Sequence, residues 1–242
     1  MDSLTAALKG IDAVVSTVAG SAIKTQTVLI DAAAAAGVKQ FIPSEYGSVT
    51  TNPKLEALPL YDNVFKIRHH LQEKADAGQL TWTVLASGAF MEFLFVPGLL
   101  DFAERKATLI DDGDNRLSVT SLATAGKAIT RILKNSESTK NRVVKVSEVI
   151  LTQNKVLKIA ERLRPEDKWN ISKVAASALL KEGLDAISAG DFSFPVVFNV
   201  IKGTALAGET YGSAYNETDN ELLGVKELTE GDLEKIVAEK LT

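Results

Sequence analysis

The sequence predicts an α/β protein built on a doubly wound parallel sheet, and two features of its first part carry that prediction. Short apolar segments alternate with segments of helical length, and the apolar segments show almost no polar alternation. Strands of that kind are covered on both faces, as in a parallel sheet between helix layers. Connections of helical length between parallel strands are right-handed, so helices are expected on the faces of the sheet.

A short helical segment precedes the first predicted strand. Leu4 to Lys9 is predicted to be helical and to end at Gly10, which acts as a C-cap. Ile11 to Val18 is the first predicted strand. A break of small residues leads into a predicted helix at Ala22 to Ala36, whose alanines allow it to lie close to the sheet.

Two further strands and one helix continue the alternation. Val38 to Ile42 is the second predicted strand, and Pro43 stops it. Leu60 to Ala77 is the next predicted helix, ending at Gly78. Leu80 to Ala86 is the third predicted strand, which completes a strand–helix–strand–helix–strand order.

Beyond Phe90 the pattern is less regular. Ala107 to Ile110 and Leu117 to Thr120 are apolar segments on either side of an acidic turn at Asp111 to Asn115. The remaining predicted elements are helices at Ala123 to Lys134, Gln153 to Arg164, Ile171 to Glu182 and Glu230 to Leu241, and a short strand at Arg142 to Val146.

Composition excludes several classes of protein. The 242 residues are 45% hydrophobic, enough for a buried core, and the net charge is −4 with scattered basic residues, so no nucleic-acid partner is expected. The absence of cysteine excludes disulfides and thiolate sites, and two histidines make a metal site unexpected. Val84 to Leu100 is apolar but short for a membrane span and is broken by Gly88 and Pro97. We therefore expect a soluble, cytoplasmic protein.

The predicted strands end in loops of small residues that form a candidate binding site. These loops are Thr17 to Ser21, Pro43 to Gly47 and Ser87 to Phe90. Ligands of open parallel sheets bind outside the carboxyl ends of the strands, and small side chains let a ligand approach the backbone. Tyr46 and Phe90 would supply flat walls. The alternative is that such turns simply favour Gly, Ser and Pro.

Several short catalytic signatures are absent. The sequence contains no G-x-G-x-x-G, no P-loop, no G-x-S-x-G and no Tyr-x-x-x-Lys pair. His69 and His70 are adjacent on a predicted helix and point about 100° apart, so they do not form a metal clamp. Lys66 lies on the same helix and is a candidate proton donor, although a helical lysine is more often a surface charge.

Some segments of the chain resemble a known family. They are Leu8 to Ser16, Gln26 to Gly47, Leu80 to Thr83, Ser87 to Phe90, Asp112 to Asp114 and Asp219 to Gly224. The most specific is AGVKQFIPSEYG at Ala36 to Gly47, which is similar to the signature AGVKRFIPSEFG. The sequence thus resembles the NmrA-like, isoflavone-reductase-like family of atypical short-chain dehydrogenases, its fungal members especially.

The resemblance implies a Rossmann-like NADP(H)-binding part at residues 1–150 and a smaller C-terminal α/β lobe for a small-molecule substrate, mainly at residues 151–242. The residues it assigns to the cofactor are Thr17, Val18, Ala19 and Gly20 for ribose and phosphates, Gln26 at the base of the next helix, Ser44, Glu45, Tyr46 and Gly47 for the nicotinamide-side ribose, and Ser87, Gly88 and Phe90 for the nicotinamide.

One departure from the family concerns the start of the chain. Family members carry a strand, a G-x-x-G-x-x-G turn and two more strands before the helix with which this sequence begins. We therefore expect an N-terminally incomplete sheet, from a truncated gene model or a natural fragment. Its first strand would then be an unpaired edge strand, and a homodimer in which that edge pairs with a second copy of the chain would satisfy its backbone groups.

A second departure concerns the catalytic lysine of the family. Its position, four residues before Arg68, holds Val64, and Lys66 is the nearest lysine.

Three functional hypotheses follow. The first is an NADPH-dependent reductase of a small aromatic or polyketide-like metabolite, impaired by the truncation. The second is a non-catalytic, nucleotide-sensing or partner-binding member, and the third is a remnant that binds no cofactor.

Overall fold

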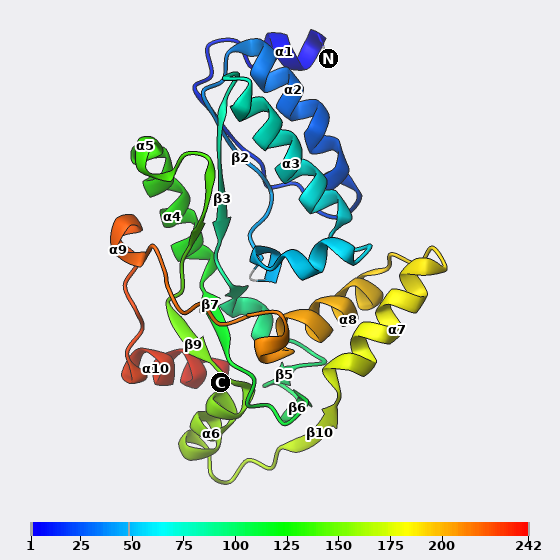
Figure 1. Cartoon of the computed structure of the whole chain (residues 1–242). Coiled ribbons are helices and arrows are strands. Elements are labelled where there is room, and N and C mark those ends of the chain that lie inside the picture. The colour runs from blue at the N-terminus through cyan, green and yellow to red at the C-terminus, as the bar shows by residue number, and fades with distance from the viewer. Residues whose placement is uncertain (1, 48, 242) are drawn as a thin grey trace.

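A parallel sheet forms the upper part of the molecule (Figure 1). The structure is a computed structural model that describes residues 2–47 and 49–241. The strand order is β1 (Ala13–Val15), β2 (Gln40–Ile42), β3 (Thr81–Ala86) and β8 (Arg142–Lys145), and each neighbouring pair is parallel. The predicted α/β fold with a parallel sheet is therefore confirmed.

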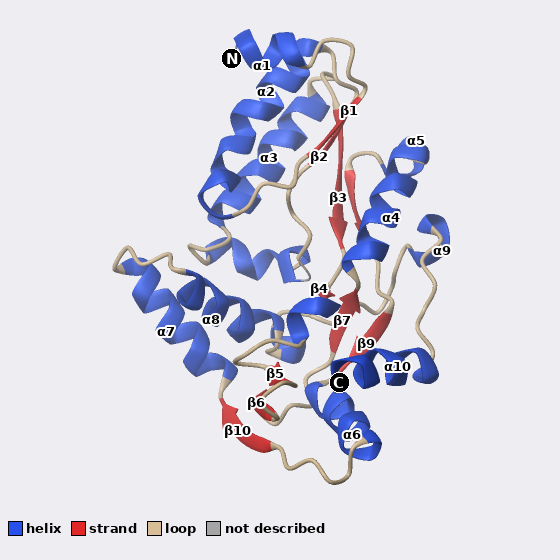
Figure 2. Cartoon of the chain, turned by 180° about the vertical axis from the view of Figure 1, so that it is seen from behind, coloured by secondary structure: helices blue, strands red, loops and turns tan. Residues whose placement is uncertain are grey.

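Helices cover both faces of this sheet (Figure 2). On one face, α2 (Gln26–Ala36) and α3 (Asp62–Asp76) bury Ile30 and Leu71 against Phe41 and Val84. On the other face, α4 (Leu122–Lys134) packs on the sheet, followed by the short α5 (Ser136–Thr139). Successive strand residues point to opposite faces, and because both faces are covered, β2 is buried at every position and β3 at every position after Thr81.

The first strand forms the edge of the sheet. β1 follows the short helix α1 (Asp2–Ala7) and pairs with β2 along one side. Among the residues that the structure describes, no strand lies along its other side, and Val14 and Val15 remain half-buried. A homodimer through this edge stays a prediction.

Two smaller sheets and further helices form the lower part (Figures 1 and 2). One sheet has the order β4 (Ala89–Phe90), β7 (Leu117–Thr120), β9 (Val149–Leu151), and the other β10 (Asn170–Val174), β6 (Lys106–Ile110), β5 (Leu100–Asp101). The helices of this part are α6 (Gln153–Leu163), α7 (Ala176–Ser188), α8 (Phe194–Ala205) and α10 (Glu230–Lys240). Short α9 (Asn220–Leu223) returns to the upper part, where Leu223 packs against α4. The boundary at residue 150 stays a prediction.

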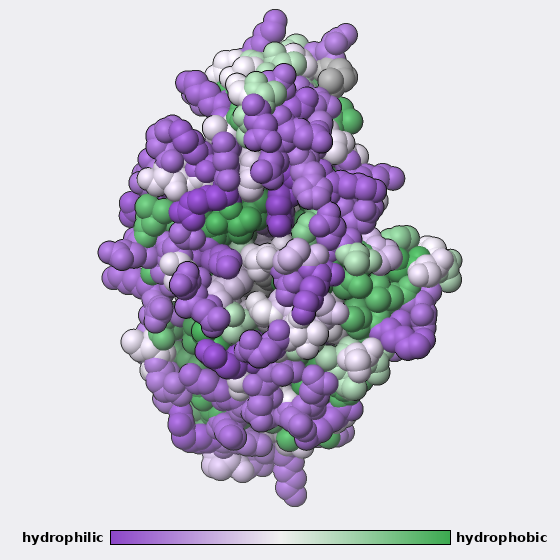
Figure 3. Space-filling model, viewed as in Figure 1, coloured by the Kyte–Doolittle hydropathy of each residue, from purple (hydrophilic) through white to green (hydrophobic). Residues whose placement is uncertain are grey.

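Short 3-10 helices make up several of the connections. They are η1 (Gly20–Thr25), η2 (Val49–Thr51), η3 (Pro53–Ala57), η4 (Met91–Leu94) and η5 (Gly208–Thr210). The predicted helix at residues 22–36 therefore starts as η1 and becomes α-helical at Gln26. Figure 3 shows a mostly hydrophilic surface with an apolar area over α7 and α8. Within the described residues, no helix is both long and apolar enough to cross a bilayer.

One predicted helix is wrong in its first half. Residues 170–174 form β10, which pairs with β6 from Asn170↔Lys106 to Val174↔Ile110, and α7 starts only at Ala176. Pairing with a strand more than sixty residues away decides this segment, and local helix propensity does not report such a partner. The helix α8, which begins with a proline in its first turn, was not predicted.

The helices α7 and α8 pack with very little space between them. A Cβ on Gly203 would lie 2.6 Å from the backbone nitrogen of Leu180 and 2.8 Å from the carbonyl oxygen of Ala176. Both contacts are with the backbone of α7, which has no flexible end that moves aside. A glycine at this position is what allows the two helices to approach so closely.

We predict that Gly203→Ala lowers the free energy of unfolding by about 1–3 kcal/mol, because the added methyl group forces the helices apart. Gly126→Ala is the matched control, since Gly126 lies in α4 with nothing within 4 Å of an added Cβ. That change should raise the stability by about 0.5–1 kcal/mol. Urea denaturation of both variants tests this, and equal effects would contradict the close packing.

Candidate functional site

The three predicted loops meet at one edge of the sheet, because the parallel strands β1, β2 and β3 all end there. Ser44 Oγ, after β2, donates a hydrogen bond of 2.6 Å to the carbonyl oxygen of Val18, after β1. The backbone N–H of Ser44 donates to Oε1 of Gln26 at the start of α2, at 2.8 Å. These bonds join the first loop, the second loop and the base of the following helix.

Tyr46 connects the second loop to the other two. Its hydroxyl donates to the carbonyl oxygen of Ser16 at 2.7 Å, and its own carbonyl oxygen accepts from Ser87 Oγ at 2.8 Å. Burial raises the pKa of Tyr46 to about 12, so the phenol keeps its proton at neutral pH. The Tyr46 hydroxyl can therefore donate to Ser16 at neutral pH, and together with the bond from Ser87 this fixes the positions of the three loops relative to one another.

The third loop passes directly against the lower part of the molecule. Gly88 has φ +70°, and a Cβ there would lie 2.2 Å from the carbonyl oxygen of Ser118 in β7. Its N–H donates to the hydroxyl oxygen of Tyr215 at 3.2 Å. Glycine is required here by both the backbone conformation and the close approach.

The exposed surface of the site is mainly backbone. Thr17, Ala19, Gly20 and Gly47 are exposed, and an added Cβ on either glycine would meet nothing within 4 Å. Val18, Ser44, Tyr46 and Phe90 are half-buried, whereas Gln26, Glu45, Ser87 and Gly88 are buried. The buried residues hold the loops in place, which leaves the first loop, the second loop and Phe90 of the third to contact a ligand.

The residues at this edge suit a ligand that carries hydroxyl groups. The hydroxyl of Ser16 is buried at the end of β1 without a hydrogen-bond partner among the described residues. Phe90 lies 6.2 Å from Phe93, ring centre to ring centre, and Phe93 is 53% exposed. The edge therefore combines an unused hydroxyl, open backbone and an aromatic wall, which fits the ribose and nicotinamide side of a dinucleotide.

A buried ion pair, missed in the sequence analysis, anchors the second loop to α3. Glu45, whose side chain is 3% exposed, pairs through both carboxylate oxygens with Nε and Nη2 of Arg68. Nη2 also donates to the carbonyl oxygen of Thr50 at 2.9 Å, and the guanidinium lies 5.0 Å from the ring centre of Phe65. Burial lowers the pKa of Arg68 to about 10, still high enough for a full charge at neutral pH.

A signal for this pair was present in the sequence. Arg68 is three residues after Phe65 and three before Leu71, so it lies on the apolar face of the predicted helix, where an arginine needs a partner. The loop acid that would match it could not be chosen without the fold.

Lys66 lies on the opposite side of α3. Its Nζ is 2.6 Å from a carboxylate oxygen of Asp62, and its side chain is 67% exposed. These contacts are those of a surface charge and do not support the catalytic role predicted for Lys66. Val64, one turn before Arg68, is half-buried on the side that Arg68 shares.

The two histidines have separate partners, as their adjacency predicts. Nε2 of His69 lies 3.6 Å from Glu56, and Nε2 of His70 lies 2.8 Å from Asp31 of α2. Within residues 2–47 and 49–241, no group of three or more His, Asp or Glu side chains is placed to hold a metal ion.

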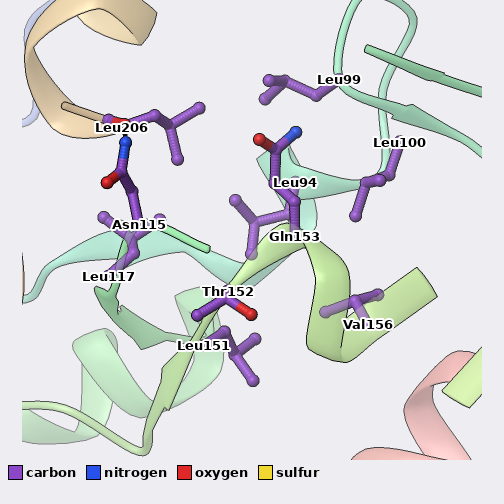
Figure 4. Close-up of a pocket in the computed structure, with 10 residues that line it drawn as sticks. All are labelled: Leu94, Leu99, Leu100, Asn115, Leu117, Leu151, Thr152, Gln153, Val156 and Leu206. Carbon is purple, nitrogen blue, oxygen red and sulfur yellow. Dashed lines mark hydrogen bonds between the residues drawn. The ribbon is translucent and has the colours of Figure 1, made fainter. Parts of the chain in front are cut away.

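A small cavity lies within the core of the lower part (Figure 4). Its volume is about 10 Å³, room for about one water molecule. The residues that line it are Leu94, Leu99, Leu100, Asn115, Leu117, Leu151, Thr152, Gln153, Val156 and Leu206. The side-chain amide of Gln153 is already bonded to the backbone of β6, so the cavity is a packing defect and not a substrate site.

Comparison with solved structures first supports the fold. Structures that resemble this chain include the ternary complex of leucoanthocyanidin reductase from Vitis vinifera (TM-score 0.72, 19% identity, 99% of this chain and 82% of that one) and an isoflavone reductase (TM-score 0.71, 21%, 98% and 78%). A third is the NADPH complex of a quinone oxidoreductase from Escherichia coli (TM-score 0.70, 18%, 100% and 80%). At these identities the likeness shows the fold.

Sequence comparison then gives the family. The model of the NmrA-like family matches residues 1–196, and the chain belongs to that family. Oxidoreductase aprR of Aspergillus flavus is 32% identical over an alignment of 237 residues that covers 96% of this chain and 77% of that protein. Oxidoreductase poxI of Penicillium oxalicum is 29% identical over an alignment of 236 residues that covers 93% of this chain and 74% of that protein. The resemblance inferred from the sequence is confirmed.

We predict that Arg68→Met lowers the free energy of unfolding by about 3–5 kcal/mol, because the carboxylate of Glu45 stays buried without its partner. The double variant Glu45→Gln/Arg68→Met should recover part of this loss. Lys181→Ala is the control: it removes an exposed pair with Asp185 and should cost less than about 1 kcal/mol. Urea denaturation distinguishes them, and similar losses for Arg68→Met and Lys181→Ala would show that the buried pair contributes little.

Proposed function

We propose that this protein is an NADPH-dependent reductase of a small aromatic or polyketide-like metabolite. The observation that carries the proposal is the edge of the sheet at which three loops are joined by Ser44, Tyr46 and Ser87 while the backbone of the first two loops stays open. The relatives aprR and poxI are named oxidoreductases, and several of the similar solved structures contain NADPH or NADP⁺, which supports the same activity here.

In this proposal the residues divide into two groups. Ser44, Gln26 and Glu45 use their polar atoms within the protein, so they position the loops. Thr17, Val18, Ala19 and Gly20 are assigned to the ribose and phosphates, and Gly47 to the nicotinamide-side ribose, since these residues present exposed or half-exposed surface. Phe90 would lie beside the nicotinamide, and the buried Ser87 and Gly88 would support that surface from beneath. The bound cofactor would supply the hydride, and the protein would position the substrate.

An aromatic substrate is supported by the surface next to the third loop. Phe90 and Phe93 follow β3 directly, and Phe93 is more than half exposed. A half-buried and an exposed aromatic ring beside an open strand end offer a flat apolar wall, which stacks favourably on an aromatic ring.

A second candidate function is nucleotide binding without turnover. The observation that favours it is Val64, which stands where the family resemblance places a catalytic lysine and which cannot transfer a proton. The position of Lys66 on the exposed side of α3 strengthens this alternative.

We predict that the protein binds NADPH and that Gly47→Val weakens this binding by about tenfold or more. The added side chain fits the free protein, since nothing lies within 4 Å of a Cβ there, but it occupies the surface assigned to the cofactor. Titration calorimetry gives the affinity, and thermal unfolding of the variant should match that of the native chain. No NADPH binding by the native chain would overturn the proposed function.

We also predict that Val64→Lys increases the rate of NADPH oxidation with aromatic ketones or quinones, because it restores a proton donor beside Arg68. Val28→Lys, on the exposed side of α2, is the matched control and should leave the rate unchanged. Substrate-dependent oxidation by the native chain would exclude the non-catalytic alternative. NADPH binding with no turnover in the native chain, and turnover in Val64→Lys, would establish it.

A further inference from the structure

The outer edge of β1 carries backbone groups that the described part of the chain does not pair. The carbonyl oxygen of Asp12 accepts from an N–H of β2 at 3.2 Å, and the N–H of Ser16 donates to the carbonyl oxygen of Ile42 at 2.9 Å. Backbone groups of successive strand residues point to alternate sides of the strand. The N–H and C=O groups of Ala13 and Val15 therefore point away from β2, where no described strand lies.

The opposite edge of the same sheet is covered. There the N–H of Asp219 donates to the carbonyl oxygen of Lys145 at 2.6 Å, and the carboxylate of Asp219 accepts from the N–H of Lys145 at 2.8 Å. Arg142 adds a charge to this edge and pairs with the same carboxylate. Charged side chains and covering segments protect sheet edges from pairing with another chain. The three residues of β1, Ala13–Val15, are uncharged and half-buried, and they have no such cover within the described residues.

The β1 strand is complementary to itself. An open edge pairs with an extended segment that has unpaired backbone groups of its own, and β1 of a second copy is such a segment. A two-fold axis perpendicular to the sheet makes the two strands antiparallel. Full overlap then places Val14 opposite Val14 of the partner subunit, and Ala13 opposite Val15 of the partner subunit. Residues paired in this way exchange both of their N–H···O=C bonds, so every outward group of β1 is satisfied.

The side chains agree with this register. Val14 packs partly against the helices on the α2 face of the sheet, and Val15 partly against the α4 face, so a second β1 strand would cover both further. The nearest charged residue is Asp12, which is paired with Lys39 of its own chain at 2.8 Å. It would lie opposite Ser16 of the partner subunit, and the register therefore brings no like charges together.

We propose that this protein forms a two-fold symmetric dimer in which the β1 strands of two copies pair antiparallel, centred on Val14. The two four-stranded sheets then form one continuous sheet across the axis. Closed two-fold dimers of this kind use the same surface on both subunits. The pairing also places Ile11 of the partner subunit opposite Thr17, so the dimer borders the first loop of the candidate site. The dimer does not depend on the proposed function.

The absence of cysteine from the chain allows a direct test of the register. In Val14→Cys the two introduced thiols lie on a non-hydrogen-bonded antiparallel pair, whose Cα atoms are about 4.5 Å apart, within the range of a disulfide. Mild oxidation in dilute solution should therefore give a covalent dimer on denaturing electrophoresis. Ile11→Cys is the matched control. Ile11 is more exposed than Val14, but its two copies would be about 20 Å apart along the strands, so this variant should stay monomeric.

Analytical ultracentrifugation tests the association itself. We expect the native chain to sediment as a dimer and Val15→Pro to associate about tenfold or more weakly, because each copy loses a hydrogen bond across the axis. The bonds to β2 stay intact in this variant. Ile171→Pro is the matched control: the N–H of Asn170 donates to β6 at 2.8 Å, so that of Ile171 points to the outer edge of β10. This control should keep the dimer.

A native chain that sediments as a monomer would overturn the proposal, and so would a dimer that survives Val15→Pro unweakened. Cross-linking of Ile11→Cys as readily as Val14→Cys would also overturn it. Circular dichroism shows whether Val15→Pro is folded, and the native sedimentation and the Val14→Cys experiment do not require that variant. NADPH is absent throughout, so a failure of cofactor binding is a separate result.

Discussion

The buried ion pair between Glu45 and Arg68 is the interaction on which the geometry of the site depends. It joins the loop after β2 to the middle of α3, and Arg68 extends the link to the backbone of Thr50. The neighbouring Ser44 and Tyr46 then reach the loops after β1 and β3. Because both charges are out of water, each needs the other, and the loop has one position in which both are satisfied.

The upper and lower parts of the molecule meet around this loop. Val49 and Leu55, which follow it, pack with Tyr61, Phe65 and Val200 in one cluster. On the other side, Gly88 lies against β7 and bonds to Tyr215. The strand ends are thus held from below by the lower part of the molecule, so the positions of the three loops depend on contacts with both parts.

The sequence by itself determined the parallel α/β fold, the family and the three strand-end loops, because these depend on local features. Apolar strands without alternation, glycines and prolines at their ends and the segment Pro43 to Gly47 are all readable along the chain. The tertiary structure alone decided that residues 170–174 form a strand, that Glu45 meets Arg68 and that Lys66 faces away. Each of these depends on residues distant in sequence, and local propensity and spacing carry no record of such partners.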